Sequence, residues 1–284
     1  MSHVRHSWVF RNGLGRARGI RVLRMKAQTE LLLYMLAWGG GKLLNPSLRS
    51  QMMGFEEWAY RNGFLRQIQR LETRGLLEKH PVAGSLEGFQ RVTDAGMRMA
   101  MGGRNPELTW DLEWDGRWRL FLFDMPSKEH ALRKSLLRTL RGCGCGCLQN
   151  SVWISPMLPE ELKPLIDASD TRPGSLILLE AESRGAGVDR MMVEDAWDFQ
   201  RVEDAYRELS TVLGHLPEEP DPQMVRAWAE SELAAWKRVV AVDPFLPRKL
   251  CPEGYSGFEV WKRRGETLER ALGLFALINA SDGK

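Results

Sequence analysis

The apolar positions of the first hundred residues follow a helical period that gives way to a short alternating segment. TELLLYMLAWG, from Thr29, repeats its apolar residues on a period of about 3.6, and PSLRSQMMG and FEEWAYRNGFLRQIQRLETRGLL indicate further helices. LEKH and GFQRVT then indicate two strands around a turn that contains Gly84, and another helix begins at Asp94. Helices followed by a two-stranded ribbon and a last helix predict a winged helix-turn-helix domain.

The pattern changes in the middle of the chain, where short strands alternate with helices. RWRLFLF, at residues 117–123, is apolar on both faces, which predicts a strand in the centre of a sheet. A helix over 127–141, strands over 145–149 and 151–155, a second helix from Pro159 and a strand in SLILLEAE complete the order βαββαβ. This order predicts a ferredoxin-like domain.

After Gly187 the pattern is helical throughout. One apolar seam is formed at spacings of three and four by Met192, Ala196, Phe199, Val202, Tyr206, Leu209 and Leu213. Further helices are predicted over 222–242 and 258–280, on either side of DPFLPRKLCPEGYSG. The seam indicates a core, and a dimer contact is the alternative.

These elements predict an α+β protein with three domains and an N-terminal arm. The expected division is a flexible basic arm at 1–26, a winged helix domain at 27–103, a ferredoxin-like domain at 104–187 and a helical C-terminal domain at 188–284.

Charge is distributed unevenly along the chain. Up to Arg104 there are 17 Lys and Arg against 7 Asp and Glu, a net charge of +10, whereas the remainder has 23 against 30, a net charge of −7. The asymmetry indicates that the first part meets a polyanion. The longest apolar run, Leu31–Trp38, is shorter than the ~18 residues of a membrane span, and no signal peptide is apparent. We therefore expect a cytoplasmic, nucleoid-associated protein without a membrane partner.

The segment RQIQRLETRG has the geometry of a recognition helix. Leu65, Ile68 and Leu71 share one face, while Arg66 and Arg70 lie about 160° from Ile68, with Gln67 and Arg74 beside them. Arginine and glutamine pair with guanine and adenine edges, so Arg66, Gln67 and Arg70 are expected on bases. A solvated helix face is the alternative. The complete DNA-binding prediction, with phosphate contacts on the ribbon, is Arg61, Asn62, Arg66, Gln67, Arg70, Arg74, Lys79 and Arg91.

Few residues suggest a catalytic, metal-binding or redox role. Asp124 ends the first central strand, where small metal-dependent nucleases of this fold place a metal-binding carboxylate, but no second carboxylate is adjacent, which favours a turn or helix-capping role. Cys143, Cys145 and Cys147 would share one face of a strand, and buried apolar thiols are favoured over a metal or redox role. We predict no catalytic residue, no metal, no cofactor and no enzymatic activity.

Three landmarks in one order resemble the PaaX family of transcriptional repressors, which control phenylacetate catabolism. They are RLETRGLL with its ribbon, DGRWRLFLFDMP with LQNSVWISP, and VEDAWDFQRVEDAYRELS with DPFLPRKLCPEGYSG. The resemblance spans nearly the whole chain after Lys26. Three features depart from the family pattern: CGCGC replaces the usual GFG before LQNSVW, Tyr255-Ser256-Gly257 replaces WPG, and the spacing from Gly54 to Arg70 is longer.

The resemblance implies a homodimeric repressor that binds double-stranded operator DNA and releases it when an aryl-acetyl-CoA-like thioester binds. Such an effector needs cations for its phosphates, and the candidates are Arg133, Lys134 and Arg138 on the helix after RWRLFLF, with a solvated helix face as the favoured alternative. Two other hypotheses stay open, a metal-dependent nuclease built on the central domain and a module that binds nucleic acid without sequence preference.

Overall fold

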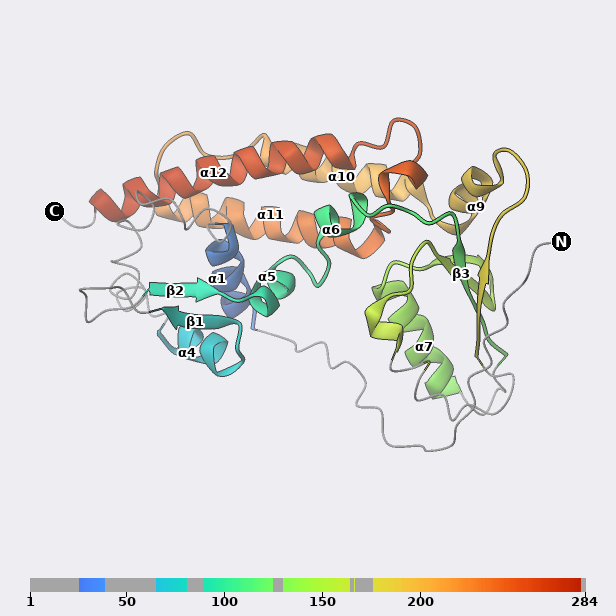
Figure 1. The fold of residues 1–284 in the computed structure, drawn as a ribbon. Coiled ribbons are helices and arrows are strands. Elements are labelled where there is room, and N and C mark those ends of the chain that lie inside the picture. The colour runs from blue at the N-terminus through green and yellow to red at the C-terminus, as the bar shows by residue number, and fades with distance from the viewer. Residues whose placement is uncertain are drawn as a thin grey trace. The chain divides into compact units, whose positions relative to one another are not determined.

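The computed structural model confirms the predicted α+β class (Figure 1). It describes residues 26–38, 65–80, 89–124, 130–163, 166 and 176–281. Contacts divide the described chain into two compact units. We call residues 106–203 with 241–255 the central unit, and residues 26–105 with 204–240 and 256–281 the helical unit. The C-terminal segments thus contribute to both units, and the domain boundaries expected at 103 and 187 stay a prediction.

The first part of the helical unit contains the predicted helix, ribbon and helix. α1 (Ala27–Trp38) is followed in the described chain by α4 (Leu65–Thr73), β1 (Leu77–His80), β2 (Phe89–Val92) and α5 (Asp94–Ala100). β1 and β2 pair antiparallel, with Glu78 opposite Arg91, as expected for the ribbon. The helix expected in PSLRSQMMG and the turn at Gly84 lie outside the described residues, so the complete winged helix-turn-helix stays a prediction.

α1 is buried on all sides rather than on one face. The fully or nearly fully buried residues are Leu31, Leu32, Leu33, Tyr34, Leu36 and Ala37. A helix that is apolar all round belongs in a core. α1 contacts α4 and α5 as well as α12 (Gly257–Ser281), which explains why no solvent face is left.

The central unit contains one four-stranded antiparallel sheet in the order β4-β5-β3-β6. Its strands are β3 (Trp118–Leu122), β4 (Gly146–Gln149), β5 (Val152–Ser155) and β6 (Ile177–Ala181). β3 lies between β5 and β6, which confirms the predicted central strand. This is the strand order of a ferredoxin-like sheet, with α7 (His130–Gly142) as its first helix. Of the second helix, the structure describes Glu160–Leu162, which form the 3-10 helix η2, Lys163 and Ile166.

Each face of this sheet has its own core. Phe121 and Trp153 pack on one face against Leu136 and Leu140 of α7. Trp118 packs on the other face with α9 (Val188–Ala196) and the 3-10 helix η3 (Arg248–Leu250). The alternation of large side chains along β3 therefore fixes which helices cover which face.

The apolar seam, predicted to be helical throughout, is interrupted. α9 ends at Ala196, Trp197 is extended, and α10 (Phe199–Leu213) begins after Asp198. Two contacts explain the break: the Trp197 indole Nε1 donates to the Gly144 carbonyl at 3.0 Å, and Asp198 Oδ1 accepts from the Arg201 amide at 3.0 Å as a helix cap. Docking of Trp197 against the sheet thus overrides the helical period.

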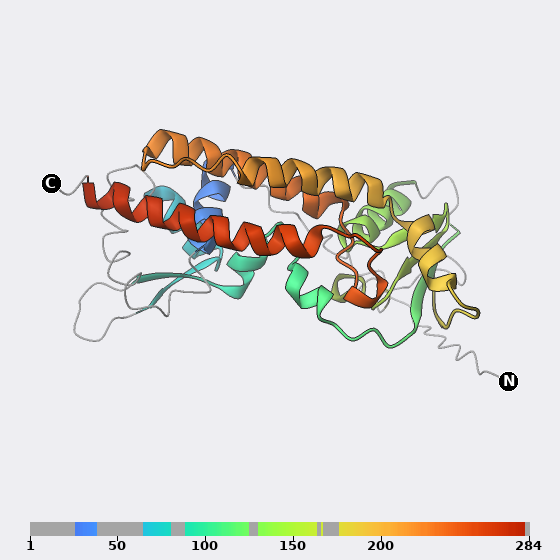
Figure 2. The same cartoon turned by 90° about the horizontal axis from the view of Figure 1, so that it is seen from above.

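The long helices α11 (Pro222–Val242) and α12 match the predicted ranges closely. They run side by side (Figure 2), with the Trp236 and Trp261 ring centroids 5.1 Å apart. Across the residues that the structure describes, no helix combines the length and apolarity needed to cross a membrane.

Candidate nucleic-acid interface

A turn at the C-terminus of α4 determines the direction in which the chain leaves this helix. Gly75 has a φ of +66°, and the Leu76 amide donates to the Leu71 carbonyl at 2.9 Å while the Gly75 amide donates to Glu72 at 2.8 Å. This is a Schellman cap, whose left-handed residue favours glycine. Because Leu71 and Leu76 are both buried, the cap directs the chain from α4 straight into β1.

The predicted arginines are on the solvent side of α4. Ile68 and Leu71 are buried, whereas Arg66, Arg70 and Arg74 are exposed. Leu65, expected on the apolar face, is instead 37% exposed because it lies on the first turn, far from the cap where Leu71 packs. The apolar face of α4 is therefore narrower than predicted.

The three exposed arginines of α4 and its C-terminal turn, Arg66, Arg70 and Arg74, have no ion-pair partner among the described residues. Several other exposed arginines of the helical unit are paired: Arg207 with Asp204 at 2.7 Å, Arg226 with Glu230 at 3.2 Å, and Arg238 with Glu208 at 2.7 Å. A face with several uncompensated guanidinium groups attracts polyanions. Arg66, Arg70 and Arg74 gather such groups on one short helix and its C-terminal turn.

Two further polar residues belong to the exposed face of α4. Gln69 and Thr73 are exposed, and the Thr73 hydroxyl donates to the Gln69 carbonyl at 2.7 Å. Gln67 is half-buried. The helical period predicts this difference in exposure. At about 100° per residue, Gln67 lies about 40° from the fully buried Leu71, whereas Gln69 lies about 160° from it.

The ribbon places the expected phosphate contacts at the surface. Lys79 and Arg91 are exposed, and Arg91 Nη1 lies 3.8 Å from Glu78 Oε1, the residue opposite it in the ribbon. This is an exposed, long ion pair that contributes little to stability. Arg61 and Asn62 lie outside the described residues.

A second group of unpaired cations lies on α7 in the central unit. Lys134, Arg138 and Arg141 are exposed and Arg133 is half-buried, and none has an ion-pair partner among the described residues. The Arg141 guanidinium lies 5.4 Å from the centre of the Trp153 ring. Three of these residues, Arg133, Lys134 and Arg138, are the predicted effector contacts.

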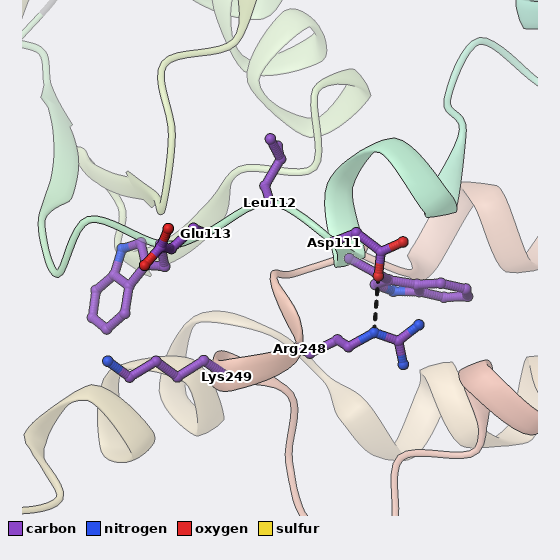
Figure 3. A pocket seen from close by; sticks show the side chains of 7 residues that line it. Asp111, Leu112, Glu113, Arg248 and Lys249 are labelled. Atoms are coloured by element: carbon purple, nitrogen blue, oxygen red, sulfur yellow. Dashed lines mark hydrogen bonds and ion pairs between the residues drawn. The ribbon is translucent and has the colours of Figure 1, made fainter.

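The central unit also contains a pocket of about 370 Å³ between α6 (Pro106–Trp110) and η3 (Figure 3). Trp110 and Trp114 line it with Leu112. Its charged residues are Asp111 and Glu113 on one segment and Arg248 and Lys249 on the other. Arg248 Nε donates to Asp111 Oδ1 at 3.0 Å, and Lys249 Nζ lies 5.7 Å from the Trp114 ring. Trp110 is 2% exposed, so Trp114 is the indole that a ligand in this pocket could contact.

The loop that presents η3 is held by a buried carboxylate. Asp243 accepts from the Phe245 amide at 2.7 Å and from the Tyr255 hydroxyl at 2.5 Å. Phe245 has a φ of +50° and its ring meets Trp110 edge-on, with the centroids 5.9 Å apart. Tyr255, where the family pattern has tryptophan, thus has a defined structural role in this chain.

The residues considered for catalysis or metal binding do not form such a site in the described chain. Asp124 is exposed and lies after the end of β3. No group of three or more His, Cys, Asp or Glu in the described chain is arranged to hold a metal ion.

The expectation that one strand carries all three cysteines is wrong. β4 begins at Gly146, because α7 ends in a turn in which Gly144 has a φ of +77°. Cys143, Cys145 and Cys147 nevertheless pack against one core. Burial raises the pKa of Cys147, and burial raises that of Cys251 to about 12, so both thiols are protonated near neutral pH.

Comparison with known proteins agrees with the class that this fold defines, an α+β protein with a ferredoxin-like sheet and C-terminal helices. The family model for the PaaX protein central Cas2-like domain matches residues 111–193, and the model for the PaaX-like protein C-terminal domain matches residues 197–265. Together they match more than half of the chain. The chain belongs to the PaaX-like family.

One solved structure supports the fold. The uncharacterized protein Rv0674 from Mycobacterium tuberculosis is similar with a TM-score of 0.52 and 18% sequence identity, over 75% of this chain and 82% of that chain. At this identity the likeness concerns the fold alone. No curated protein matches the chain.

Proposed function

We propose that this protein is a sequence-specific, DNA-binding transcriptional regulator of the repressor class that acts as a homodimer. The observation that supports the proposal best is the exposed face of α4, whose arginines have no ion-pair partner in the described chain, next to a two-stranded ribbon. Membership of the PaaX-like family agrees with this function, because the sequence resemblance is to DNA-binding repressors.

In this proposal α4 enters the major groove and reads bases with its exposed side chains. Arg66 and Arg70 pair with guanine edges, and Gln69 joins the predicted Gln67 as a candidate for adenine, because Gln69 is the more exposed. Phosphate contacts come from Arg74 and from the ribbon through Lys79 and Arg91, with Arg61 and Asn62 as further predicted contacts.

The Arg70→Ala variant tests the assignment of α4. It should bind its preferred duplex more weakly by about 1–3 kcal/mol and lose discrimination at one base position, because a bidentate contact is removed. Fluorescence anisotropy with duplexes altered one position at a time measures both effects. Arg226→Ala, which removes an exposed but ion-paired arginine, is the control and should bind like the wild type. An Arg70→Ala variant with unchanged affinity and base preference would refute the assignment.

An effector of the acyl-CoA class is the second part of the proposal. To release DNA, the effector must bind the DNA-free arrangement of the regulator better than the DNA-bound one, because a ligand with equal affinity for both shifts no equilibrium. The pocket at Trp110 and Trp114 is a better place for its aryl group than the α7 face, because small-molecule sites are concave. Thermal-shift measurements with several acyl-CoA esters, repeated on Trp114→Ala, test this; a shift retained in the variant excludes the pocket.

A further inference from the structure

The cations of α7 form a continuous stripe. At about 100° per residue, Lys134, Arg138 and Arg141 fall within about 60° of one another on the helix surface. Leu136 and Leu140 are buried against the sheet, and Leu136 lies about 160° from Lys134. Lys134 and Arg138 therefore face away from the sheet, and at the C-terminal end of the helix Arg141 lies to the side, with its guanidinium 5.4 Å from the centre of the Trp153 ring. We call Lys134, Arg138 and Arg141 the α7 stripe.

The surroundings of the α7 stripe are unusual for this part of the chain. The central unit has 19 Asp and Glu against 14 Lys and Arg, a net charge of −5, yet α7 contains no acidic residue. Several other cations of the same unit are paired, such as Arg119 with Asp115 at 2.6 Å and Arg190 with Glu194 at 2.8 Å. Within the described residues, the cations of the α7 stripe have no such partner. Positive charge is thus concentrated on α7 and is not neutralised by neighbouring carboxylates of the described chain.

The shape of this face favours a polymer over a small molecule. A helix surface is convex, whereas small-molecule sites bury most of the ligand in a cleft. From Lys134 to Arg141 the helix rises by about 10 Å. One strand of duplex DNA has a phosphate for about every 3.4 Å of its axis, so that length spans about three phosphates. The number and spacing of the cations suit a nucleic-acid backbone.

We propose that the α7 stripe is a second DNA-binding surface, which contacts backbone phosphates without reading sequence. The proposal rests on the proposed function in that the polyanion is the regulator's own target duplex. It assigns the two cationic helices different roles: α4 provides base discrimination, and α7 provides affinity that depends on salt but not on sequence. The α7 cations are then DNA contacts rather than the effector contacts that the sequence suggested.

The salt dependence of DNA binding tests the α7 stripe. Each phosphate contact contributes about 0.9 to the slope of log K against log salt concentration. The variant Lys134→Gln, Arg138→Gln, Arg141→Gln should therefore bind with a slope smaller in magnitude by about 2 to 3 per protomer, or about 5 for the homodimer, and with unchanged base preference. The matched control is Arg190→Gln, Arg207→Gln, Arg226→Gln, which removes the same charge from ion-paired positions and should keep the wild-type slope.

The outcomes separate this proposal from its alternatives. Because Arg141 also packs over Trp153, the double variant Lys134→Gln, Arg138→Gln provides a second test with a slope change of about 2 per protomer, or about 4 for the homodimer. Equal slopes in wild type and both α7 variants would overturn the proposal. So would loss of the thermal shift with acyl-CoA esters at an unchanged slope, which would make α7 an effector site. If the wild type prefers no sequence but the slopes differ as expected, the proposed function fails and the α7 surface stands.

Discussion

Gly75 shows how much of the DNA-binding face depends on a single backbone conformation. Its φ of +66° closes the cap of α4, and the adjoining strand begins two residues later. The Thr93 hydroxyl donates to the Gly75 carbonyl at 2.7 Å and the Thr93 amide donates to the Leu76 carbonyl at 3.1 Å. Gly75 and its neighbours thus join the end of α4 to the start of α5.

Gly75→Ala should destabilise the protein by about 1 kcal/mol, because alanine pays a conformational penalty in the left-handed region. A Cβ at this position meets no atom within 4 Å, so the loss should come from the backbone alone. Urea unfolding followed by circular dichroism measures it. Gly75→Asn should recover part of the loss, since asparagine tolerates this conformation. A loss with Asn as large as with Ala would contradict the explanation.

At the residue scale, the helical period predicted the exposed arginines of α4 correctly, but it predicted the limits of the buried face less well. The exposed positions of Arg66 and Arg70 follow from the helical period, and the structure agrees. Gln69 was missed because only Ile68 was used as the reference for the buried face, although the position of Leu71 distinguishes it from Gln67. Leu65 was assigned to the core by its spacing, but spacing alone does not say where along the helix the packing partners end.

At the scale of elements, a buried ion pair joins three helices of the helical unit. Arg264 of α12 donates to Glu232 of α11 at 2.8 Å and to the Tyr34 hydroxyl of α1, which itself donates to Glu232. Arg264 is 2% exposed and Glu232 is fully buried. The Arg264 guanidinium lies 4.2 Å from the centre of the Trp236 ring, a cation–π contact.

The ionisation of this network follows from its neighbours. Burial raises the pKa of Tyr34 well above its ordinary value, so the phenol stays a hydrogen-bond donor. Burial opposes the charge of Arg264, but attraction to Glu232 and Tyr34 outweighs it and raises the pKa. Arg264 therefore remains charged near neutral pH.

Arg264→Ala should lower the free energy of unfolding by about 3–5 kcal/mol, because Glu232 is left as an unpaired buried charge. Chemical denaturation measures the change. The double variant Glu232→Met, Arg264→Met should be markedly more stable than Arg264→Ala, since it leaves no unpaired charge. Arg226→Ala, which breaks an exposed pair, should cost at most about 1 kcal/mol. Equal small losses in Arg264→Ala and Arg226→Ala would show that the network contributes little.

The elements themselves were largely predictable, whereas their interruptions and partners were not. Period-two alternation gave β3 its central place in the sheet, and the spacing in α11 gave its full length. The break at Trp197 depends on a contact with Gly144, 53 residues away, and the contact of Tyr34 with Arg264 joins residues 230 apart. Local patterns contain no information about such contacts.

At the scale of the whole molecule, net charge alone was an incomplete guide. The +10 of the first 104 residues pointed to α4 and its ribbon, but the −7 of the remainder concealed the α7 stripe. Both faces gather several neighbouring cations that have no ion-pair partner in the described chain, and finding such groups requires side-chain positions. The proposed dimer would present two copies of each face, with α4 reading half-sites about one DNA turn apart.

Selection of binding sites from random duplexes by the purified protein tests the central claim most directly. The wild type should enrich one sequence with two half-sites whose centres lie about 10 base pairs apart. Arg66→Ala, Arg70→Ala should lose that enrichment while keeping salt-dependent binding to unrelated DNA. A wild type that enriches no sequence, or a double variant that enriches the same one, would contradict the account.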